Sequence, residues 1–427
     1  MDKIGYDLKK EMLPFTKKSD PVLYELAQRE LDRQQYNIEM IASESTVPME
    51  VMELSGSVFT NKTLEGYPGY RYQAGSGVAD ELELLLNERT KEVYGCDHVN
   101  HQPYSGSTAN YSVYASVLSP GDKVLSMRLD QGGHLTHGHP VNLYSKFYQF
   151  SNYGVNAETE QIDYEEMEKK AKELQPKLII AGGSSYPRII DYERIASIAK
   201  ANGSLFMVDM AHVSGLVGAN VIPSPVPWAD FVTSSTTKTF CGPRSGMVMC
   251  KGEFAKALDK GVFPGSLGSI HLTTMAAKAW SMNYMKSDEF RQIMGQVVKN
   301  SSKLALELEN NGFRIVSGGS DNHIVMVDLR PKQISGRQFQ DALDHIGLTV
   351  NKNQIPNDPA SPFVTSGVRI GTTCVSQRGM KEAEMTEIAG ILNQVAENID
   401  NETVLAEVKN RARKIIEKFP IYSAVEF

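Results

Sequence analysis

The stretch Ser204–Met210 reads SLFMVDM, an apolar run that carries one carboxylate, Asp209, near its end. Its length and composition predict a short buried strand. Comparable runs occur on both sides of it, at Lys123–Met127, Leu178–Ala181, Phe231–Thr233 and Met247–Met249. Helical patterns lie between these runs, for example at Asp163–Leu174 and Asp191–Ala199. The alternation predicts an α/β domain with a largely parallel sheet, whose sites lie beyond the carboxyl ends of the strands.

The chain has 427 residues, which is long for one ordinary compact core. After about Met285 the pattern changes to that of a smaller α+β domain. Its expected elements are a helix at Glu289–Asn310, strands at Phe313–Val316 and Ile324–Asp328, a helix at Gly336–His345 and a strand at Ser366–Gly371. We therefore predict an N-terminal arm over residues 1–40, a large domain over 41–286 and a small domain over 287–427.

The composition narrows the class of protein. The net charge is -7 and no basic stripe is evident, which argues against a nucleic-acid partner. No apolar run is long enough to span a bilayer, and Met1–Asp20 lacks the apolar core of a signal peptide. The four cysteines match no zinc or redox spacing, so we expect reduced, unpaired thiols in a cytoplasmic protein.

Asp209 and Lys238 form the most informative pair. A carboxylate at the mouth of a buried strand is costly unless it meets a cation. Lys238, in the sequence SSTTKTF, follows Asp209 by 29 residues, after the next short strand. A protonated pyridine nitrogen could supply the cation, and Lys238 could form a Schiff base with the aldehyde of the same cofactor. An Asp–Lys salt bridge, or an Asp that caps the next turn, also explains the spacing, and spacing alone favours these explanations.

Two further segments could complete such a site. Ser105, Gly106 and Ser107 precede a helix predicted over Asn110–Leu118, where N–H groups and hydroxyls would suit a phosphate or simply cap the helix. The segment Gly132–His139 carries three histidines, which could bind metal, stack on an aromatic ring or be solvated. No cysteine or carboxylate nearby completes a zinc pattern, and we predict no metal site.

Two charged residues could act on a substrate. Arg369 lies in a strand of small and apolar residues, where its guanidinium could hold a substrate carboxylate or pair with an internal one. Glu65 stands before the stretch Tyr67–Gly77, which is rich in Gly and Tyr and is predicted to be an ordered loop. Glu65 could carry a proton there or belong to a salt bridge that orders the loop.

The chain resembles serine hydroxymethyltransferase over nearly its whole length. The matching stretches are Ile41–Glu44, Glu65–Gly69, Ser105–Ser107, Gly132–Gly138, Val208–Val213, Lys238–Thr239, Gly242–Arg244, Val350–Asn353 and Pro362–Gly367. The resemblance implies a fold-type I, aspartate-aminotransferase-like enzyme that depends on pyridoxal 5'-phosphate and forms a homodimer or a tetramer. It also implies that the enzyme moves a one-carbon unit between a small amino acid and tetrahydrofolate.

The resemblance also implies roles for the cofactor-binding residues. Lys238 would form the Schiff base, Asp209 would pair with the pyridine nitrogen and His134 would stack on the ring. The other cofactor ligands that it implies are Ser105, Gly106 and Ser107 for the phosphate, Gly268 arriving at the phosphate from the neighbouring subunit, and Ser184 and His212 near the phenolic oxygen.

For the substrates, the resemblance implies that Arg369 and Ser43 hold the amino-acid carboxylate and that Glu65 handles the proton of the hydroxymethyl group. It further implies a folate pocket lined by Tyr72, Leu129, Gly133, Leu135 and Asn353.

The departures from the family pattern gather around this site. Thr63 and Gln73 each stand where the family carries Tyr, and Thr237 replaces the His before the lysine. Leu64 replaces a small residue, and Ser266–Ser269 replaces part of a Gly-rich segment. Two smaller side chains in place of aromatic rings would leave room for a substituent on Cα. We therefore weigh a 2-methylserine/D-alanine enzyme nearly equally with an ordinary serine/glycine enzyme.

Two other functions remain as alternatives. A folate-independent aldolase or transaldolase would act on threonine-like β-hydroxy amino acids, although Glu65 and Asn353 argue against it. A catalytically inactive homologue that serves in binding is opposed by the presence of Lys238, Asp209 and Arg369 together.

Overall fold

The computed structural model describes residues 10–11, 13–423 and 425–426. Within the segment Met1–Asp20, residues 1–9 and 12 lie outside the described residues. The chain divides into two compact units, one formed by residues 43–295 and the other by residues 1–42 and 296–427. We call them the sheet unit and the terminal unit. No helix in the described part of the chain has the length and apolar character needed to cross a membrane.

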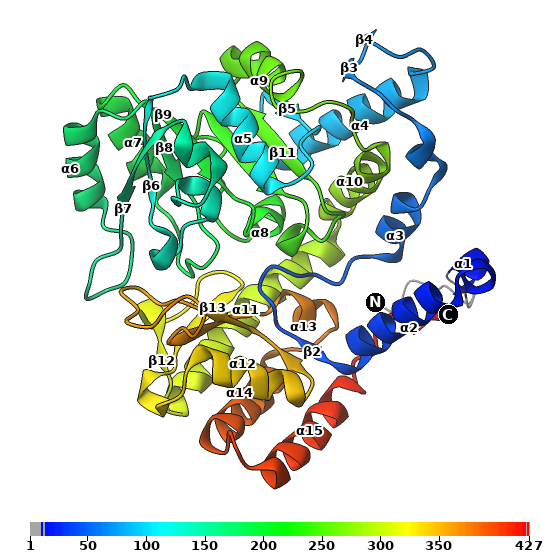
Figure 1. Ribbon diagram of the computed structural model, residues 1–427, viewed down its shortest axis with the longest axis vertical. Coiled ribbons are helices and arrows are strands. Elements are labelled where there is room, and N and C mark those ends of the chain that lie inside the picture. Colours follow the sequence, from blue (N-terminus) through cyan, green and yellow to red (C-terminus); the bar gives the residue numbers. More distant parts are fainter. Residues whose placement is uncertain (1–9, 12, 424, 427) are drawn as a thin grey trace. The chain divides into compact units, whose positions relative to one another are not determined.

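The sheet unit is built on a seven-stranded sheet with the order β5-β11-β10-β9-β8-β6-β7 (Figure 1). Its strands are β5 (His98–Asn100), β6 (Lys123–Met127), β7 (Gln149–Tyr153), β8 (Leu178–Ala181), β9 (Leu205–Asp209), β10 (Phe231–Ser235) and β11 (Gly246–Cys250). The five strands from β10 to β7 are parallel, and β11 runs antiparallel to both of its neighbours. The prediction of a large, mostly parallel sheet is confirmed.

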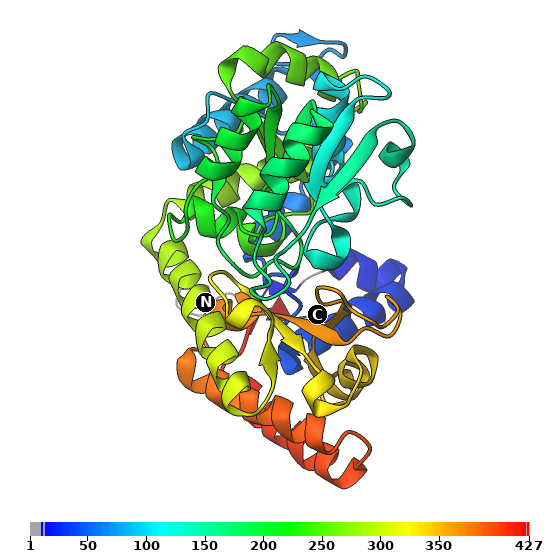
Figure 2. The same ribbon diagram turned by 90° about the vertical axis from the view of Figure 1, so that its left-hand side faces the viewer.

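Helices lie on both sides of this sheet, as Figures 1 and 2 show. Helices α5 and α9 share an apolar core with one face, to which Val113, Ile180, Met207, Phe231 and Leu258 contribute. The helices of this unit are α3 (Met49–Ser55), α4 (Gly77–Tyr94), α5 (Gly106–Val117), α6 (Tyr164–Leu174), α7 (Tyr192–Ala201), α8 (Ser214–Gly218), α9 (Ala255–Val262) and α10 (Leu272–Met285). Covering both faces explains why the strands read as nearly continuous apolar runs.

Three elements of this unit differ from the sequence predictions. Helix α5 begins at Gly106, four residues before the predicted start, because Ser105 and Thr108 form a reciprocal capping box. The loop predicted over Tyr67–Gly77 contains most of a short hairpin, β3 (Gly66–Tyr67) and β4 (Tyr70–Arg71). Strand β7 was not predicted, because its sequence QFSNY carries mostly polar and aromatic residues.

The terminal unit combines a four-stranded antiparallel sheet, β12-β13-β16-β15, with helices. Its strands are β12 (Arg314–Ile315), β13 (Ile324–Asp328), β15 (Asn351–Asn353) and β16 (Gly367–Gly371), and β2 (Ile38–Glu39) pairs with β14 (Leu348–Thr349). Its helices are α1 (Pro14–Ser19), α2 (Pro21–Tyr36), α12 (Gly336–His345), α13 (Thr373–Gln377), α14 (Glu382–Glu397) and α15 (Glu402–Ile416). Helix α11 (Asp288–Asn310) continues along the chain from the sheet unit into the terminal unit, and β1 (Lys10–Glu11) pairs with β17 (Val425–Glu426).

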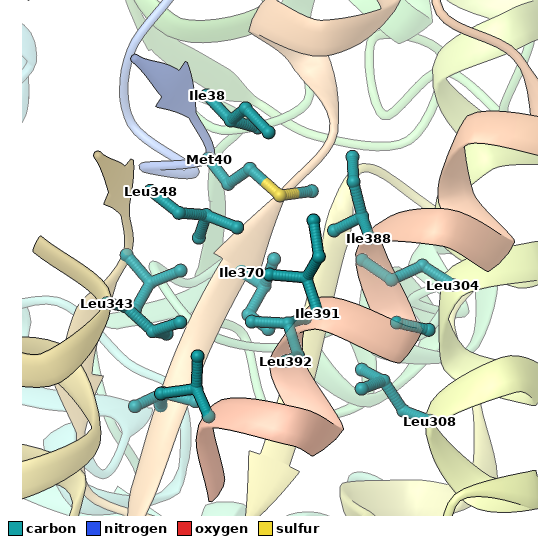
Figure 3. Close-up of a cluster of buried hydrophobic side chains, with 14 of the residues drawn as sticks. Ile38, Met40, Leu304, Leu308, Leu343, Leu348, Ile370, Ile388, Ile391 and Leu392 are labelled. Atoms are coloured by element: carbon teal, nitrogen blue, oxygen red, sulfur yellow. The ribbon is translucent and has the colours of Figure 1, made fainter. Parts of the chain in front are cut away.

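One apolar core holds the terminal unit together (Figure 3). Met40, Leu304, Leu348, Ile370 and Ile391 are all fully buried in it, so segments from both ends of the chain share the same core. Asp20 caps α2, accepting a hydrogen bond from the Leu23 N–H at 3.1 Å. The four cysteines are free thiols and all four are buried.

Candidate active site

Asp209 and Lys238 lie at the same edge of the main sheet. Asp209 is the last residue of β9, and β10 pairs with β9 in parallel register, with Thr233 opposite Asp209. Lys238 follows the end of β10 by three residues and begins a short 3-10 turn, with a left-handed φ of 54°. Because neighbouring parallel strands end at the same edge, the fold brings to one edge two residues that are 29 positions apart.

The carboxylate of Asp209 is buried and anchored through both oxygens. Oδ2 accepts hydrogen bonds from Asn110 Nδ2 at 2.8 Å and from His137 Nε2 at 3.0 Å, while Oδ1 accepts the backbone N–H of Ala211 at 3.0 Å. Only 8% of Asp209 is exposed. Three donors from three different segments therefore fix the orientation of this carboxylate.

The same contacts keep Asp209 ionised. Burial alone would raise its pKa, but the His137 hydrogen bond, the nearby imidazoles and the Asn110 amide together lower the pKa of Asp209 below its ordinary value. The hydrogen-bond donors to the Asp209 carboxylate are Asn110, His137 and Ala211. Asp209 does cap the turn that follows it, through Ala211, as the other explanation supposed.

A polar network orients the imidazole of His134. Thr136 donates its backbone N–H to His134 Nδ1 at 3.2 Å, and the Thr136 hydroxyl lies 2.7 Å from the same nitrogen. Asn110 donates to that hydroxyl at 2.8 Å with the same amide that binds Asp209, and its oxygen accepts from Thr233 at 2.6 Å. Since Nδ1 accepts a hydrogen bond, the proton of a neutral His134 ring resides on Nε2. The half-buried ring is thereby held in one orientation.

His134, His137 and Asp209 have ligand atoms within 4.8 Å of one another, a spacing that could also hold a metal ion. This grouping was not predicted, because the carboxylate comes from a strand 72 residues beyond His137. In the structure, His137 Nε2 and Asp209 Oδ2 are hydrogen-bonded to each other at 3.0 Å.

The start of α5 is lined by hydroxyl groups. The first N–H groups of a helix have no partner within it, and Ser105, Gly106 and Ser107 stand at this position. A Cβ on Gly106 would lie 3.3 Å from the Ser235 Cβ, so the end of β10 packs against the helix start. The Ser235 and Thr237 hydroxyls are hydrogen-bonded at 2.9 Å. Backbone donors and these hydroxyls together suit an anion such as phosphate.

The segments after β6 and β8 pack closely beside Asp209. Ser184 donates its hydroxyl to the Gly133 carbonyl at 3.0 Å and its N–H to the Gly132 carbonyl at 2.8 Å. A Cβ on Gly182, which has a φ of 107°, would come within 2.0 Å of the Asp209 carbonyl oxygen. His212 is buried, and its carbonyl accepts from the Thr239 hydroxyl at 2.8 Å. Only glycine at 182 allows this approach of β8 and β9.

Glu65 lies at the open end of the β3–β4 hairpin. The Tyr72 N–H donates to the Glu65 carbonyl at 3.2 Å, and the Gln73 side chain contacts both the backbone and the carboxylate of Glu65. A Cβ on Gly268 would lie 3.5 Å from Glu65 Oε1. Thr63 is exposed, as is Tyr72, whose ring lies edge-on to Phe263. Glu65, Gln73 and Gly268 are thus brought together within one chain.

The remaining predicted substrate residues are spread over both units. In the sheet unit, Ser43 lies in a turn and Leu129 in a short 3-10 turn, both half-buried, while Leu135 is exposed. Arg369 and Asn353 belong to the terminal unit.

In the terminal unit, Arg369 on β16 lies opposite Asn351 on β15 and donates its Nε hydrogen to the Asn351 side-chain oxygen at 2.9 Å. Burial lowers the pKa of Arg369 to about 10.

Several residues with a clear role at this site were not singled out from the sequence. The side chains that hold Asp209 and His134 are those of Asn110, Thr136 and His137. Ser235, the last residue of β10, packs against the start of α5. The three histidines close together in Gly132–His139 were the available signal for His137. Nothing in the local sequence marks Asn110, because its partners lie 26, 99 and 123 residues away.

These side chains fit pyridoxal 5'-phosphate. A buried, ionised carboxylate suits a protonated pyridine nitrogen, and a fixed, half-buried imidazole suits the face of an aromatic ring. The hydroxyl-lined start of α5 suits the phosphate, and Lys238 at the same edge suits the aldehyde. The sheet topology and these residues define the class of fold-type I pyridoxal-phosphate enzymes.

A comparison with family models identifies the group within this class. Residues 16–392 match the model described as serine hydroxymethyltransferase. The match covers most of the 427 residues, and the chain belongs to the serine hydroxymethyltransferase family.

Proposed function

We propose that the protein is a hydroxymethyltransferase that moves a one-carbon unit between a small amino acid and tetrahydrofolate. The observation that carries the proposal is the carboxylate of Asp209, which is buried, ionised and held by three donors at the edge of the sheet where Lys238 lies. When bound, pyridoxal 5'-phosphate supplies an electron sink for the negative charge that forms at Cα.

The chain's own residues divide the remaining tasks. Asp209 would keep a proton on the pyridine nitrogen, and the His134 ring, fixed by Thr136, would lie against the cofactor. Glu65 would take the proton of the substrate hydroxyl and return it, since its carboxylate is half-buried and held by Gln73. Arg369 would bind the amino-acid carboxylate with its guanidinium.

For the amino-acid donor, we propose 2-methylserine or serine. Thr63 and Gln73 have no aromatic ring, whereas the family carries a Tyr at each of these positions. In the structure Thr63 is exposed and Gln73 contacts Glu65. The smaller side chains favour a donor with an additional methyl group on Cα. Tyr72, Leu129, Gly133, Leu135 and Asn353 would then contact the folate. We also propose that the protein is a cytoplasmic homodimer or tetramer.

Cofactor capture is tested first. We expect purified protein to develop visible absorbance with pyridoxal 5'-phosphate and to lose it on reduction with borohydride, which would fix the cofactor to Lys238. Lys238→Ala should bind the cofactor without the borohydride-stable adduct, while Lys251→Ala, a lysine that pairs with Asp230 at 2.7 Å, should behave as wild type. A wild-type protein without this absorbance would contradict the proposal.

The donor is then identified by aldehyde release, which is formaldehyde from L-serine and 2-methylserine and acetaldehyde from L-threonine, each measured with and without tetrahydrofolate. Preference for 2-methylserine with folate supports the altered donor, and preference for L-serine supports the ordinary one. Rapid acetaldehyde release from threonine without folate would instead identify an aldolase.

A further inference from the structure

We propose that Gln73 is a positioning residue that holds the carboxylate of Glu65 for proton transfer. The inference rests on the proposed function of Glu65 and adds the group that orients it. The register of the β3–β4 hairpin pairs Gly66 with Arg71 and Tyr67 with Tyr70. Glu65 precedes the hairpin and Gln73 lies two residues beyond it, so the register brings the two side chains together.

Gln73 contacts Glu65 at two points. Its Oε1 accepts the Glu65 backbone N–H at 2.8 Å, and its Nε2 donates to Glu65 Oε2 at 3.4 Å. One amide thereby fixes both the backbone and the side chain of Glu65. Oε2 is therefore the carboxylate oxygen that receives the amide N–H. Oε1, on the side toward Gly268, is left to exchange the proton.

The hairpin is a rigid base for this contact. The buried Arg71 guanidinium donates to Asp80 at 2.7 Å and also pairs with Glu83 and the Gly66 carbonyl. Tyr67 donates its hydroxyl to the Asp259 carbonyl at 2.6 Å. Because the base of the hairpin is held by α4 and α9, movement of Glu65 is confined to its side chain, where Gln73 acts.

The charged and titratable groups around Glu65 come from few elements. Burial raises the pKa of Tyr104, and the negative charge of Glu65 adds to that rise. The His271 ring lies tilted by 56° to the Tyr104 ring, with their centroids 4.8 Å apart, and Lys62 donates to the Ala74 carbonyl at 2.6 Å. The nearest cation on the hairpin, Arg71, is already paired with two carboxylates. Gln73 is therefore the side chain that donates directly to the Glu65 carboxylate.

Exchanging the two partners tests the contact. Gln73→Glu keeps the acceptor for the Glu65 N–H but places a second carboxylate against the first. As the pH rises from 5 to 8, we expect the thermal midpoint of the cofactor-loaded Gln73→Glu variant to fall by several degrees relative to that of wild type. In Glu65→Gln/Gln73→Glu an amide again faces a carboxylate, and the midpoint should return toward that of wild type. The matched control, Gln161→Glu, changes an exposed glutamine and should show neither effect.

A second readout separates positioning from a purely structural role. Two carboxylates that share a site take up a proton at higher pH than one. In Gln73→Glu, the acid limb of the kcat/KM profile for donor cleavage should move up by about one pH unit, with roughly a tenfold loss at pH values below that limb. The exchanged double variant should stay inactive despite its restored stability, because residue 65 then lacks the acid.

The outcomes can be told apart. Additive stability effects of Glu65→Gln and Gln73→Glu would overturn the proposal, whatever the activity. Coupled stability with an unmoved acid limb would also overturn it, because the contact would then be only structural. If wild type cleaves no donor, the proposed function fails, and the stability coupling still decides whether Gln73 holds Glu65.

Discussion

His137 joins Asp209 to the segment that carries His134. Its Nε2 donates to Asp209 Oδ2 at 3.0 Å, while its Nδ1 accepts the backbone N–H of His134 at 3.3 Å. With Nδ1 occupied as an acceptor, the proton lies on Nε2, where it stabilises the carboxylate. One buried imidazole thus sets both the charge of Asp209 and the path of the chain around the second imidazole.

Removal of this imidazole should weaken cofactor binding. A hydrogen bond to a charged group contributes about 1.5–3 kcal/mol, so His137→Leu should reduce the affinity for pyridoxal 5'-phosphate roughly tenfold or more. The measurement is an absorbance titration of the cofactor-free protein. His139→Leu, two residues along the same segment and half-buried, is the matched control. Equal affinities for the two variants would show that His137 does not support Asp209.

The ionisation of Asp209 should appear in the acid stability of the protein. Burial opposes the charge, but His137 and Asn110 lower the pKa of Asp209 overall. A carboxyl group with a lowered folded-state pKa stabilises the fold above its ordinary value of about 3.9, and this stabilisation disappears as the pH falls. Wild type should therefore lose thermal stability more steeply below pH 4 than Asp209→Asn does. Parallel curves from pH 6 to pH 2 would argue against an ionised Asp209.

The sequence predicts the parts of the site that are local. The strands β6, β8 and β13 are found with their predicted bounds, because short buried strands read as apolar runs. The placement of Asp209 and Lys238 at one edge follows from the alternation of strands and helices alone. The start of α5 was misplaced because the reciprocal cap of Ser105 and Thr108, rather than the apolar pattern, decides it.

The partners of Asp209 could not be predicted in the same way. Asn110 and His137 reach it across 99 and 72 residues, and no periodicity records such contacts. The same limit applies to Gln73, whose contact with Glu65 depends on a hairpin register within a segment expected to be a loop. Local patterns encode elements, whereas polar contacts between distant elements appear only once the fold is known.

The close approach of β8 to β9 should not tolerate a side chain at position 182. A Cβ on Gly182 would lie 2.0 Å from the Asp209 carbonyl, and its φ of 107° is unfavourable for other residues. We expect Gly182→Ala to lower the free energy of unfolding by about 2 kcal/mol or more and to weaken cofactor binding. Gly295→Ala, on α11 with open space around it, should be neutral or stabilising by up to about 1 kcal/mol. A stable, cofactor-binding Gly182→Ala protein would contradict this account.

A buried lysine on α10 should make stability depend on pH in the alkaline range. Lys278 is fully buried and donates to the carbonyls of His101 and Gly246, at 2.7 and 3.1 Å. Burial lowers the pKa of Lys278 to about 7, and the negative charge of Glu83 only partly opposes this. In the unfolded chain the pKa of a lysine is about 10.4. Between these two values the unfolded state therefore holds a proton that the folded state lacks.

Stability should consequently rise with pH from about 7 to 10 in wild type, relative to Lys278→Met, by at most about 1.4 kcal/mol per pH unit. Thermal unfolding of both proteins at intervals of one pH unit measures the difference, and comparison with the variant removes the alkaline effects that the two share. Lys286→Met, at the exposed end of the same helix, should follow wild type. If Lys278→Met shows the same slope as wild type, the ammonium group is compensated by its two carbonyl partners and stays charged in the core.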